Sequence, residues 1–388
     1  METLDYSAWG MRLRQEIAGR RLPLGGTLEL TRRCNNRCAH CYNNLPAEDA
    51  AARAAELGKE DWHRLLDEAA ATGCLYLLLT GGEPLLHPGF AAIYEHARRR
   101  GLLVTVFTNG RGLTAETVDL LAAIPPLAVE VTLYGATRDT WERVTGVPGS
   151  YAQSLAGIER LGKRGLPLRL KTTISRVNSH ELPGMRRLAS SFGAPFRFDA
   201  LLNARLDGSR GPLSLRLSPE EAVALDLADP ERVRALREAK LRPTPAACGI
   251  YACGAGFHAF AVDPYGRLRL CALAAEGGGF DLRRGTFREG WEEWADRERA
   301  RPAGAATRCS ACGLLDLCGA CPQAARLECG KESAPVEFLC EVAHLRALAL
   351  GVRVPAHGAC DFCPGGARHE EISARAEALR KTLPAAAT

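Results

Sequence analysis

The sequence predicts an α/β protein in which strands and helices alternate, followed by a small cysteine-rich domain. Six short apolar runs between residues 27 and 202 alternate with segments of helical periodicity, which is typical of a parallel sheet with right-handed crossovers. The 15 cysteines lie at the two ends of this pattern: four precede residue 80, eleven follow residue 247, and none lies between. At 388 residues the chain is long enough for two domains.

The elements follow from apolar spacing and from the residues that cap them. Thr114 is a fitting N-cap, and Gly73, Gly101 and Gly165 each follow an expected helix as its C-terminal cap. We expect strands at residues 27–30, 74–80, 102–108, 129–134, 168–174 and 196–202, and helices at residues 60–71, 90–100, 114–123, 150–163 and 180–192. Six such units form either a doubly wound sheet or a partial barrel, and in both folds ligands bind at the carboxyl ends of the strands.

Composition and charge exclude several classes of protein. Hydrophobic residues make up 46% and charged residues 24%, as in ordinary globular proteins, and the net charge of +5 is too small and dispersed to indicate nucleic-acid binding. The first residues are acidic, unlike a signal peptide, and no apolar run reaches the roughly 18 residues of a membrane span. We therefore expect a cytoplasmic protein without membrane contact, in which so many cysteines indicate metal rather than disulfides.

Three cysteines follow the first expected strand with the spacing Cys34-x3-Cys38-x2-Cys41. A four-iron cluster takes one thiolate per iron, so three local thiolates would leave the fourth iron open to another ligand. A zinc site that recruits His40, the residue between the last two thiols, is an alternative, although zinc commonly takes Cys-x2-Cys pairs. A disulfide framework does not suit a long chain without a secretion signal.

A second motif, Gly81-Gly82-Glu83-Pro84, follows the second expected strand. Two glycines allow the backbone to approach a ligand closely, Glu83 can pair with a cationic amine, and proline fixes the exit from the turn. Polar residues also end the later strands, and each could be an ordinary turn residue, but all would meet at one rim of the sheet. These residues are Thr108, Asn109, Gly110, Thr132, Tyr134, Lys171, Thr173, Arg197 and Asp199.

Together the two motifs resemble those of the radical S-adenosylmethionine (SAM) enzymes, with His40 in the ring position of the cluster loop. The resemblance implies a partial (β/α)6 TIM-type barrel, a [4Fe-4S] cluster on Cys34, Cys38 and Cys41, and a Gly81–Pro84 loop that binds the methionine amino group. The cofactor would be cleaved reductively to a 5′-deoxyadenosyl radical that abstracts hydrogen from a substrate. By the same resemblance, Asn109 and Thr132 are candidates to contact the ribose or adenine.

The C-terminal cysteines resemble the SPASM extension, which holds two auxiliary [4Fe-4S] clusters. Cys253, Gly266 and Cys271 fit the first half of its pattern, and the run from Cys309 to Cys321 fits the second, except that two residues rather than three precede Cys321. The resemblance assigns Cys248, Cys253, Cys271 and Cys321 to a first auxiliary cluster and Cys309, Cys312, Cys318 and Cys340 to a second. Cys329 is the substitute for Cys321, and a pair of zinc ribbons is the alternative reading.

We expect the chain to divide into an N-terminal segment (1–23), the barrel (24–206), a linker with a helix capped by Ser218 (207–245), an iron–sulfur domain (246–345) and a tail (346–388). Cys74 is interpreted as a small buried hydrophobe. Cys360 and Cys363 in the tail are left over, and metal ligation, a redox dithiol and two free thiols all stay open.

The resemblance implies oxidative modification of a ribosomally synthesised peptide, by crosslinking, epimerisation or side-chain oxidation. Modification of a small molecule such as a tetrapyrrole is the alternative. It is favoured because only 33 residues precede Cys34, fewer than a leader-binding module would need. A non-catalytic metal-binding regulator is an alternative of another class. We expect an external electron donor of flavodoxin or ferredoxin type. Asp199 is a candidate proton acceptor, although a structural ion pair with a neighbouring arginine would equally explain it.

Overall fold

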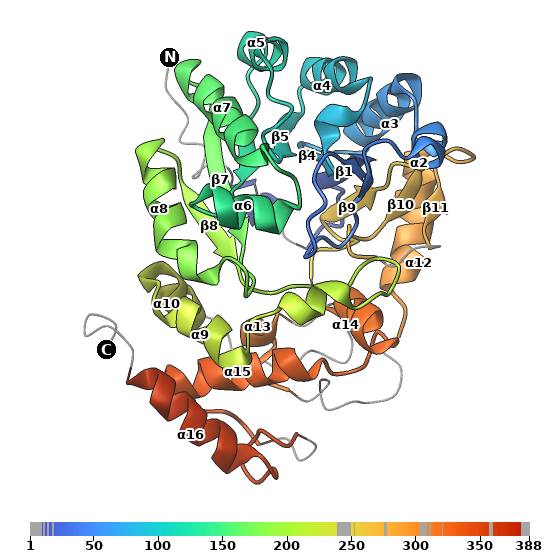
Figure 1. The fold of residues 1–388 in the computed structure, drawn as a ribbon. Helices are drawn as coiled ribbons and strands as arrows, with labels where there is room; N and C mark the ends of the chain where they lie inside the picture. Colours follow the sequence, from blue (N-terminus) through green and yellow to red (C-terminus); the bar gives the residue numbers. More distant parts are fainter. Residues whose placement is uncertain are drawn as a thin grey trace.

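The computed structural model describes residues 10, 12–13, 15–17, 19–238, 250–251, 253–274, 278–302, 309, 312–319, 321–356 and 360–381. Figure 1 shows an open barrel whose strands are surrounded by helices, with the C-terminal helices packed below it. No helix in these ranges is long and apolar enough to cross a membrane.

The barrel contains six parallel strands that neighbour one another in chain order. They pair in the order β1-β4-β5-β6-β7-β8, and each neighbouring pair is parallel. A doubly wound sheet reverses its strand order at a switch point, whereas this order does not, so the partial barrel is confirmed. The strands are β1 (Gly25–Thr31), β4 (Tyr76–Gly81), β5 (Leu103–Thr108), β6 (Ala128–Thr132), β7 (Leu168–Thr173) and β8 (Phe196–Asp199), with a separate two-stranded pair of β2 (Arg33–Cys34) and β3 (Leu45–Pro46).

The expected helices are confirmed with small shifts at their ends, and Thr114 caps α5 as expected by accepting a hydrogen bond from Thr117. The fifth begins at Leu182 instead of residue 180, because a 3-10 turn precedes it. The barrel helices are α2 (Ala50–Ala55), α3 (Lys59–Ala71), α4 (Phe90–Arg99), α5 (Ala115–Ala123), α6 (Arg138–Thr145), α7 (Ser150–Lys163) and α8 (Leu182–Ser191), and the short 3-10 turns are η1 (Pro84–Leu86), η2 (Ser179–Glu181) and η3 (Gly211–Leu215).

The strands have two different faces, and this difference makes room for a site. In β5 the side chains of Val104 and Val106 are fully buried, whereas Thr105 and Phe107, which alternate with them along the strand, are only half-buried. Successive side chains of a strand point to opposite faces, so the fully buried set packs under the outer helices and the other set lines the barrel interior. Cys74 is buried as expected, although the strand itself begins two residues later at Tyr76.

A hairpin from the cysteine-rich region extends the barrel sheet. β9 (Ala259–Val262) pairs with β1 in parallel, and β10 (Arg267–Arg269) and β11 (Phe280–Asp281) continue antiparallel from it. The turn between β9 and β10 is closed by the Gly266 amide, which donates to the Asp263 carbonyl at 3.1 Å, and Gly266 has a φ of +81°. Arg269 pairs with Glu29 of β1 at 2.8 Å, with both side chains buried, so the hairpin is joined to the barrel by charge as well as by backbone.

The C-terminal helices pack on the segment that follows the barrel. Ser218 caps α9 as expected, and α9 packs against α15. Arg216 forms a bidentate pair with Glu328 at 3.0 and 2.7 Å, and Asp226 pairs with Arg346 at 2.7 Å. The helices of this part are α9 (Pro219–Leu227), α10 (Pro230–Arg237), α11 (Phe287–Glu289), the π-helix η5 (Gly290–Ala295), α12 (Asp296–Arg299), α13 (Leu315–Cys318), α14 (Pro322–Cys329), α15 (Glu337–Ala349) and α16 (His369–Arg380).

Candidate functional site

The three cysteines of the first motif gather in the loop that follows β1. Cys34 and Cys38 are buried and Cys41 is half-buried. The pKa of the Cys38 thiol is raised well above its usual value, and burial is the main cause. The neighbouring Cys41 and Cys34 thiols raise this pKa further, because their negative charges would lie close to Cys38. The loop therefore brings together three thiols whose deprotonation needs a compensating positive charge, which a metal cluster provides.

The Arg205 side chain and the Asn36 backbone hold this loop in place. Arg205 donates to the carbonyl oxygens of Cys41 and Asn44, each at 3.0 Å. The backbone N–H of Asn36 points at the Cys34 sulfur at 3.4 Å. The structure thus places the Arg205 guanidinium on the backbone of the cluster loop. Its role is thus to position the thiols.

The Gly81–Pro84 loop lies directly against the start of the cluster loop. The amide of Gly82 donates to the Thr31 carbonyl at 2.7 Å, and that of Glu83 donates to the Arg33 carbonyl at 2.9 Å. A Cβ on Gly82 would lie 2.4 Å from the carbonyl oxygens of both Arg32 and Arg33, a contact that no side chain tolerates. Gly81 has a φ of +136°, which only glycine adopts readily. Both glycines are therefore required for the two motifs to meet.

Glu83 is a buried carboxylate whose orientation is fixed by three donors. Its oxygens accept hydrogen bonds from the Thr108 hydroxyl at 2.8 Å, the Asn109 amide at 2.8 Å and the Leu85 amide at 3.2 Å. Burial raises its pKa to about 7, although these hydrogen bonds oppose the shift. Within the part of the chain that the structure describes, no lysine or arginine forms an ion pair with Glu83. A buried carboxylate of this kind fits the ammonium group of a bound ligand.

Asn109 connects the two motifs through its side chain. Its Nδ2 donates to Asn35 Oδ1 at 2.7 Å and lies 3.7 Å from the Cys34 sulfur, while its backbone amide binds Glu83. Thr132 ends β6, the strand beside β5, and its side chain is half-buried. Both predicted cofactor contacts therefore stand at the carboxyl ends of neighbouring strands.

Aromatic residues cover the last turn of the cluster loop. The His40 and Tyr134 rings lie 6.2 Å apart between centroids, and Tyr134 packs edge-on against Trp141 at 5.4 Å. Burial lowers the pKa of His40 to about 4, so the imidazole is neutral at ordinary pH. His40, the ring residue of the motif, thus forms with Tyr134 and Trp141 an aromatic wall beside the thiols.

A charged cluster lies on the inner wall of the barrel, on strands β6, β7 and β8. Lys171 pairs with Glu130 at 3.4 Å, Arg197 also pairs with Glu130, and the Lys171 ammonium lies 3.0 Å from the centre of the Phe107 ring. Burial lowers the pKa of Lys171 to about 7, and Arg197 adds to the shift, although Glu130 opposes it. Lys171 and Arg197 therefore lie together, as expected, and both pair with Glu130, which was not predicted as a site residue. A single carboxylate within the apolar run of residues 128–133 was the available signal.

Asp199 ends β8 and is exposed, on the same strand face as Arg197. Its carboxylate accepts a hydrogen bond from the Leu201 amide at 2.9 Å. Among the described residues Asp199 forms no ion pair with an arginine, because the neighbouring Arg197 pairs with Glu130. The structure therefore does not show the structural ion pair that was the alternative for Asp199.

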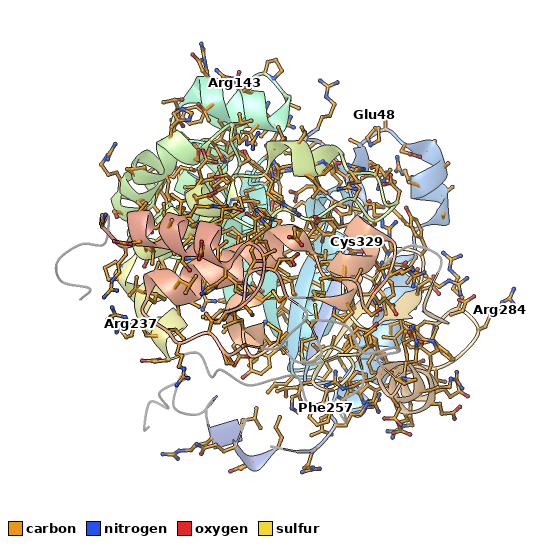
Figure 2. The ribbon with its side chains drawn as sticks, turned by 90° about the horizontal axis from the view of Figure 1, so that it is seen from below. Glu48, Arg143, Arg237, Phe257, Arg284 and Cys329 are labelled. Carbon is orange, nitrogen blue, oxygen red and sulfur yellow. The ribbon has the colours of Figure 1, made fainter. Side chains whose placement is uncertain are left out.

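The first predicted group of auxiliary cysteines comes together around Cys271. Burial raises the pKa of the Cys271 thiol to about 11, and the neighbouring Cys321 and Cys253 thiols raise it further. Cys248, the fourth predicted member, lies outside the described residues. Cys329, the proposed substitute for Cys321, is exposed at the end of α14 and is labelled in Figure 2. The charges that act on its thiol are those of Glu328 and two arginines.

The second predicted group lies around α13 and the start of α15. The Cys312 amide donates to the Cys309 carbonyl at 3.2 Å in a tight turn. The Cys318 thiol donates to the Leu339 carbonyl at 3.6 Å, which places it beside the residue that precedes Cys340. Cys309 and Cys312 are therefore neighbours, and Cys318 lies beside the start of α15, which carries Cys340.

The chain is thus an open parallel barrel with three thiols and a buried carboxylate at its rim. One family model and several known proteins match it. The family model described as Radical SAM superfamily matches residues 28–188. The AdoMet-dependent heme synthase of Methanosarcina barkeri is 37% identical over 166 residues, which are 43% of this chain and 47% of that protein. The PqqA peptide cyclase of Ruegeria pomeroyi is 36% identical over 172 residues, 44% of this chain and 45% of that protein. The matched residues 28–188 include Cys34, Cys38, Cys41 and the Gly81–Pro84 loop.

Other similarities extend beyond the barrel. The chain spans less than half the length of the heme synthase and the peptide cyclase, but the mycofactocin maturase MftC of Mycobacterium ulcerans is 29% identical over 313 residues, 77% of this chain and 83% of that protein. Streptococcus suis SuiB bound to precursor peptide SuiA has a TM-score of 0.64 at 15% identity over 86% of this chain and 79% of that one. Native anSMEcpe with bound AdoMet has a TM-score of 0.61 at 14% identity over 84% and 97%. At such identities the structures show a shared fold alone.

Proposed function

We propose that this chain is a radical SAM enzyme that cleaves S-adenosylmethionine reductively and abstracts hydrogen from a ribosomally synthesised peptide. The observation that supports this most strongly is the junction of the two motifs: the Glu83 loop hydrogen-bonds to the backbone that leads into Cys34, so a ligand held by Glu83 lies next to the thiols. The expected products are an oxidised peptide, with a crosslink, an inverted stereocentre or an oxidised side chain.

The proposed roles of the rim residues follow from their positions. Cys34, Cys38 and Cys41 hold a [4Fe-4S] cluster, and Gly81 to Pro84 receive the methionine part of S-adenosylmethionine, with Glu83 on its amino group. Asn109 and Thr132 face the rest of the cofactor from the ends of β5 and β6. When bound, the cluster and S-adenosylmethionine supply a 5′-deoxyadenosyl radical. The half-buried His40 and the buried Tyr134 shield this corner from water.

The interior wall of the barrel offers the groups that meet the substrate. A lysine with a pKa of about 7 holds or releases a proton near neutral pH, and Lys171 is kept in that state by burial beside Arg197. Asp199 stands at the end of the same wall, and we keep it as the candidate proton acceptor. The Glu130 carboxylate orients both cations.

We further propose two auxiliary [4Fe-4S] clusters, which would accept the electron that a substrate radical must lose to become a closed-shell product. Cys321 and Cys253 both raise the pKa of Cys271, whereas the charges that act on Cys329 are those of Glu328 and two arginines. This supports Cys321 rather than Cys329 as a ligand of the first auxiliary cluster, with Cys248 as its fourth ligand. Cys309, Cys312, Cys318 and Cys340 form the second. An external flavodoxin or ferredoxin would reduce the cluster at the barrel rim, and a cytoplasmic location suits such a partner.

The peptide substrate is favoured over a tetrapyrrole by the C-terminal part of the chain. The heme synthase similarity covers only 43% of this chain. The structures that match across 84% and more include SuiB bound to precursor peptide and anSMEcpe bound to a peptide. This wider similarity, which extends beyond the length of the barrel, supports a peptide substrate.

The substrate class is tested by co-expression of this chain with short open reading frames from its own genomic neighbourhood, followed by mass spectrometry and stereochemical analysis of each peptide. We expect one peptide to lose hydrogen or invert a stereocentre, and to stay unmodified beside a Cys38→Ala variant. Conversion of a tetrapyrrole by the same preparation, with every peptide unchanged, would instead establish the small-molecule alternative.

A further inference from the structure

The leftover cysteine pair of the tail meets a histidine in the interior of the C-terminal part. His344 lies on α15, and Cys360 and Cys363 lie in the turn that precedes α16. His344 Nε2 is 3.3 Å from the Cys363 sulfur and 3.8 Å from the Cys360 sulfur, and the three ligand atoms all lie within 4.8 Å of one another. All three side chains are buried. Nothing in the radical SAM site uses them.

A second contact fixes the tautomer of His344. Its Nδ1 is 2.7 Å from the carbonyl oxygen of Cys340, one helical turn earlier. A carbonyl oxygen can accept a hydrogen bond but cannot donate one. Nδ1 is therefore the protonated nitrogen, and the lone pair of Nε2 points at the two sulfurs. A histidine that binds a metal through one nitrogen characteristically donates its other N–H to a carbonyl or carboxylate in this way.

The turn around the two cysteines is built to keep both sulfurs on one side. The Cys363 amide donates to the Cys360 carbonyl at 3.3 Å, and the Gly366 amide donates to the Cys363 carbonyl at 2.8 Å. A Cβ on Gly366 would lie 2.3 Å from the Cys360 carbonyl oxygen, so glycine is required there. Phe362 between the cysteines is fully buried against the His344 ring, with 5.5 Å between centroids.

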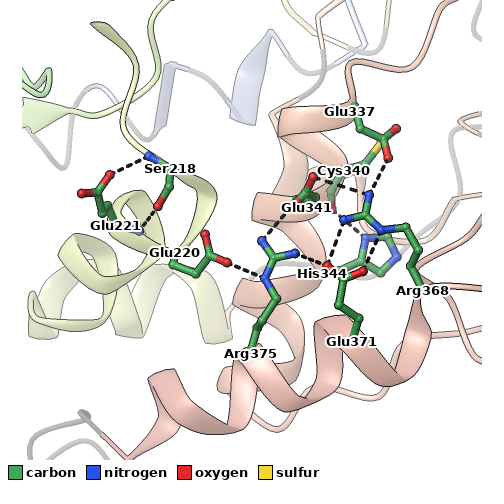
Figure 3. Close-up of polar contacts among 10 residues, drawn as sticks. All are labelled: Ser218, Glu220, Glu221, Glu337, Cys340, Glu341, His344, Arg368, Glu371 and Arg375. Atoms are coloured by element: carbon green, nitrogen blue, oxygen red, sulfur yellow. Dashed lines mark hydrogen bonds and ion pairs between the residues drawn. The ribbon is translucent and has the colours of Figure 1, made fainter. Parts of the chain in front are cut away.

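Ion pairs hold this turn and α16 against α15, as Figure 3 shows. Arg375 on α16 pairs with Glu341 on α15 at 2.7 Å and also with Glu220 on α9. Arg368, just before α16, pairs with Glu337 at 3.5 Å. The frame around the cysteines is thus fixed by contacts that do not involve the sulfurs themselves.

The spacing of the ligand atoms selects between one metal ion and a cluster. Tetrahedral zinc with Zn–S near 2.3 Å and Zn–N near 2.0 Å separates its ligands by roughly 3.5 to 3.8 Å, which the observed 3.3 and 3.8 Å approach closely. In a four-iron cluster each thiolate binds a different iron, so the ligands lie farther apart. We propose that His344, Cys360 and Cys363 bind one zinc ion that ties α16 to α15. This site is separate from the iron–sulfur sites and does not depend on the substrate of the barrel.

The proposal is tested on the full chain, purified anaerobically, by elemental analysis and by zinc K-edge absorption, to which the iron clusters do not contribute. We expect one zinc per chain, with two sulfur ligands at about 2.3 Å and nitrogen at about 2.0 Å. Zinc-free protein, or zinc bound by four sulfurs or by oxygen and nitrogen alone, would overturn the proposal. This measurement needs no variant.

Two variants provide the second arm. Cys363→Ser and His344→Asn should lose the zinc while iron and acid-labile sulfide stay at the wild-type level. Cys74→Ser, at a buried thiol in the barrel, is the matched control and should keep both metals. If Cys363→Ser loses iron and keeps zinc, the two thiols belong to an iron–sulfur cluster and the assignment is wrong.

Discussion

Replacement of Glu83 by glutamine tests the proposed contact between this carboxylate and the ammonium group of S-adenosylmethionine. Glutamine keeps the shape of the side chain, and its amide oxygen still accepts from the Asn109 amide, which binds Glu83 at 2.8 Å. What is lost is the negative charge in a fully buried position. A hydrogen bond to a charged group contributes about 2 kcal/mol, so the dissociation constant for S-adenosylmethionine should rise by roughly 30-fold.

The assay is equilibrium binding of S-adenosylmethionine to protein with a reconstituted cluster. Glu181→Gln is the matched control, because Glu181 also accepts several hydrogen bonds, from Ala136 and Thr140 among others, and these donors lie at the start of α6 rather than in the cluster loop or the Gly81–Pro84 loop. The control should bind as the wild type does. Equal affinities for Glu83→Gln and wild type, with iron content unchanged, would refute the reasoning.

Three further changes have clear expected outcomes. Cys321→Ser should lower the iron content by about four atoms per chain through loss of a cluster, whereas Cys329→Ser should leave it unchanged; the reverse result would reassign the ligand. Arg216→Met removes one partner of a buried ion pair with Glu328, so the free energy of unfolding should fall by about 3 kcal/mol, and an unchanged denaturation midpoint would contradict this. The Lys171 pKa is lowered from 10.5 to about 7, so between these values the unfolded chain binds the extra proton and stability should rise with pH. Lys171→Met should flatten that rise in denaturation curves recorded from pH 7 to pH 10, and an identical pH profile would show that the lysine is not buried in this way.

The barrel could be predicted from the sequence because its signals are local. Each strand is a short apolar run and each outer helix carries its own caps, such as Thr114 before α5. The pairing of β9 with β1 could not be predicted, since it joins residues more than 230 positions apart and neither strand differs in composition from an ordinary edge strand. The buried pair of Arg269 and Glu29 belongs to the same contact, and only the fold shows that their charges meet.

The site was predictable where the chemistry is written in short motifs. The cluster cysteines and the Gly81–Pro84 loop were expected to be halves of one site, and the structure brings them into backbone contact. The contact of Arg205 with the cluster loop could not be predicted, because its position after β8 does not indicate where a long side chain reaches. His344 gave no signal, since it sits within the apolar pattern of α15 and meets Cys360 and Cys363 only after the chain has turned back.

The central claim is tested most directly by incubating the reconstituted, chemically reduced protein with S-adenosylmethionine and measuring 5′-deoxyadenosine by liquid chromatography. We predict that the wild-type protein forms 5′-deoxyadenosine and methionine, and that Cys38→Ala forms neither, because the thiol that it lacks is one of three at the cluster site. No cleavage by wild-type protein that carries its full iron content, or equal cleavage by Cys38→Ala, would contradict the account and would favour a metal-binding regulator.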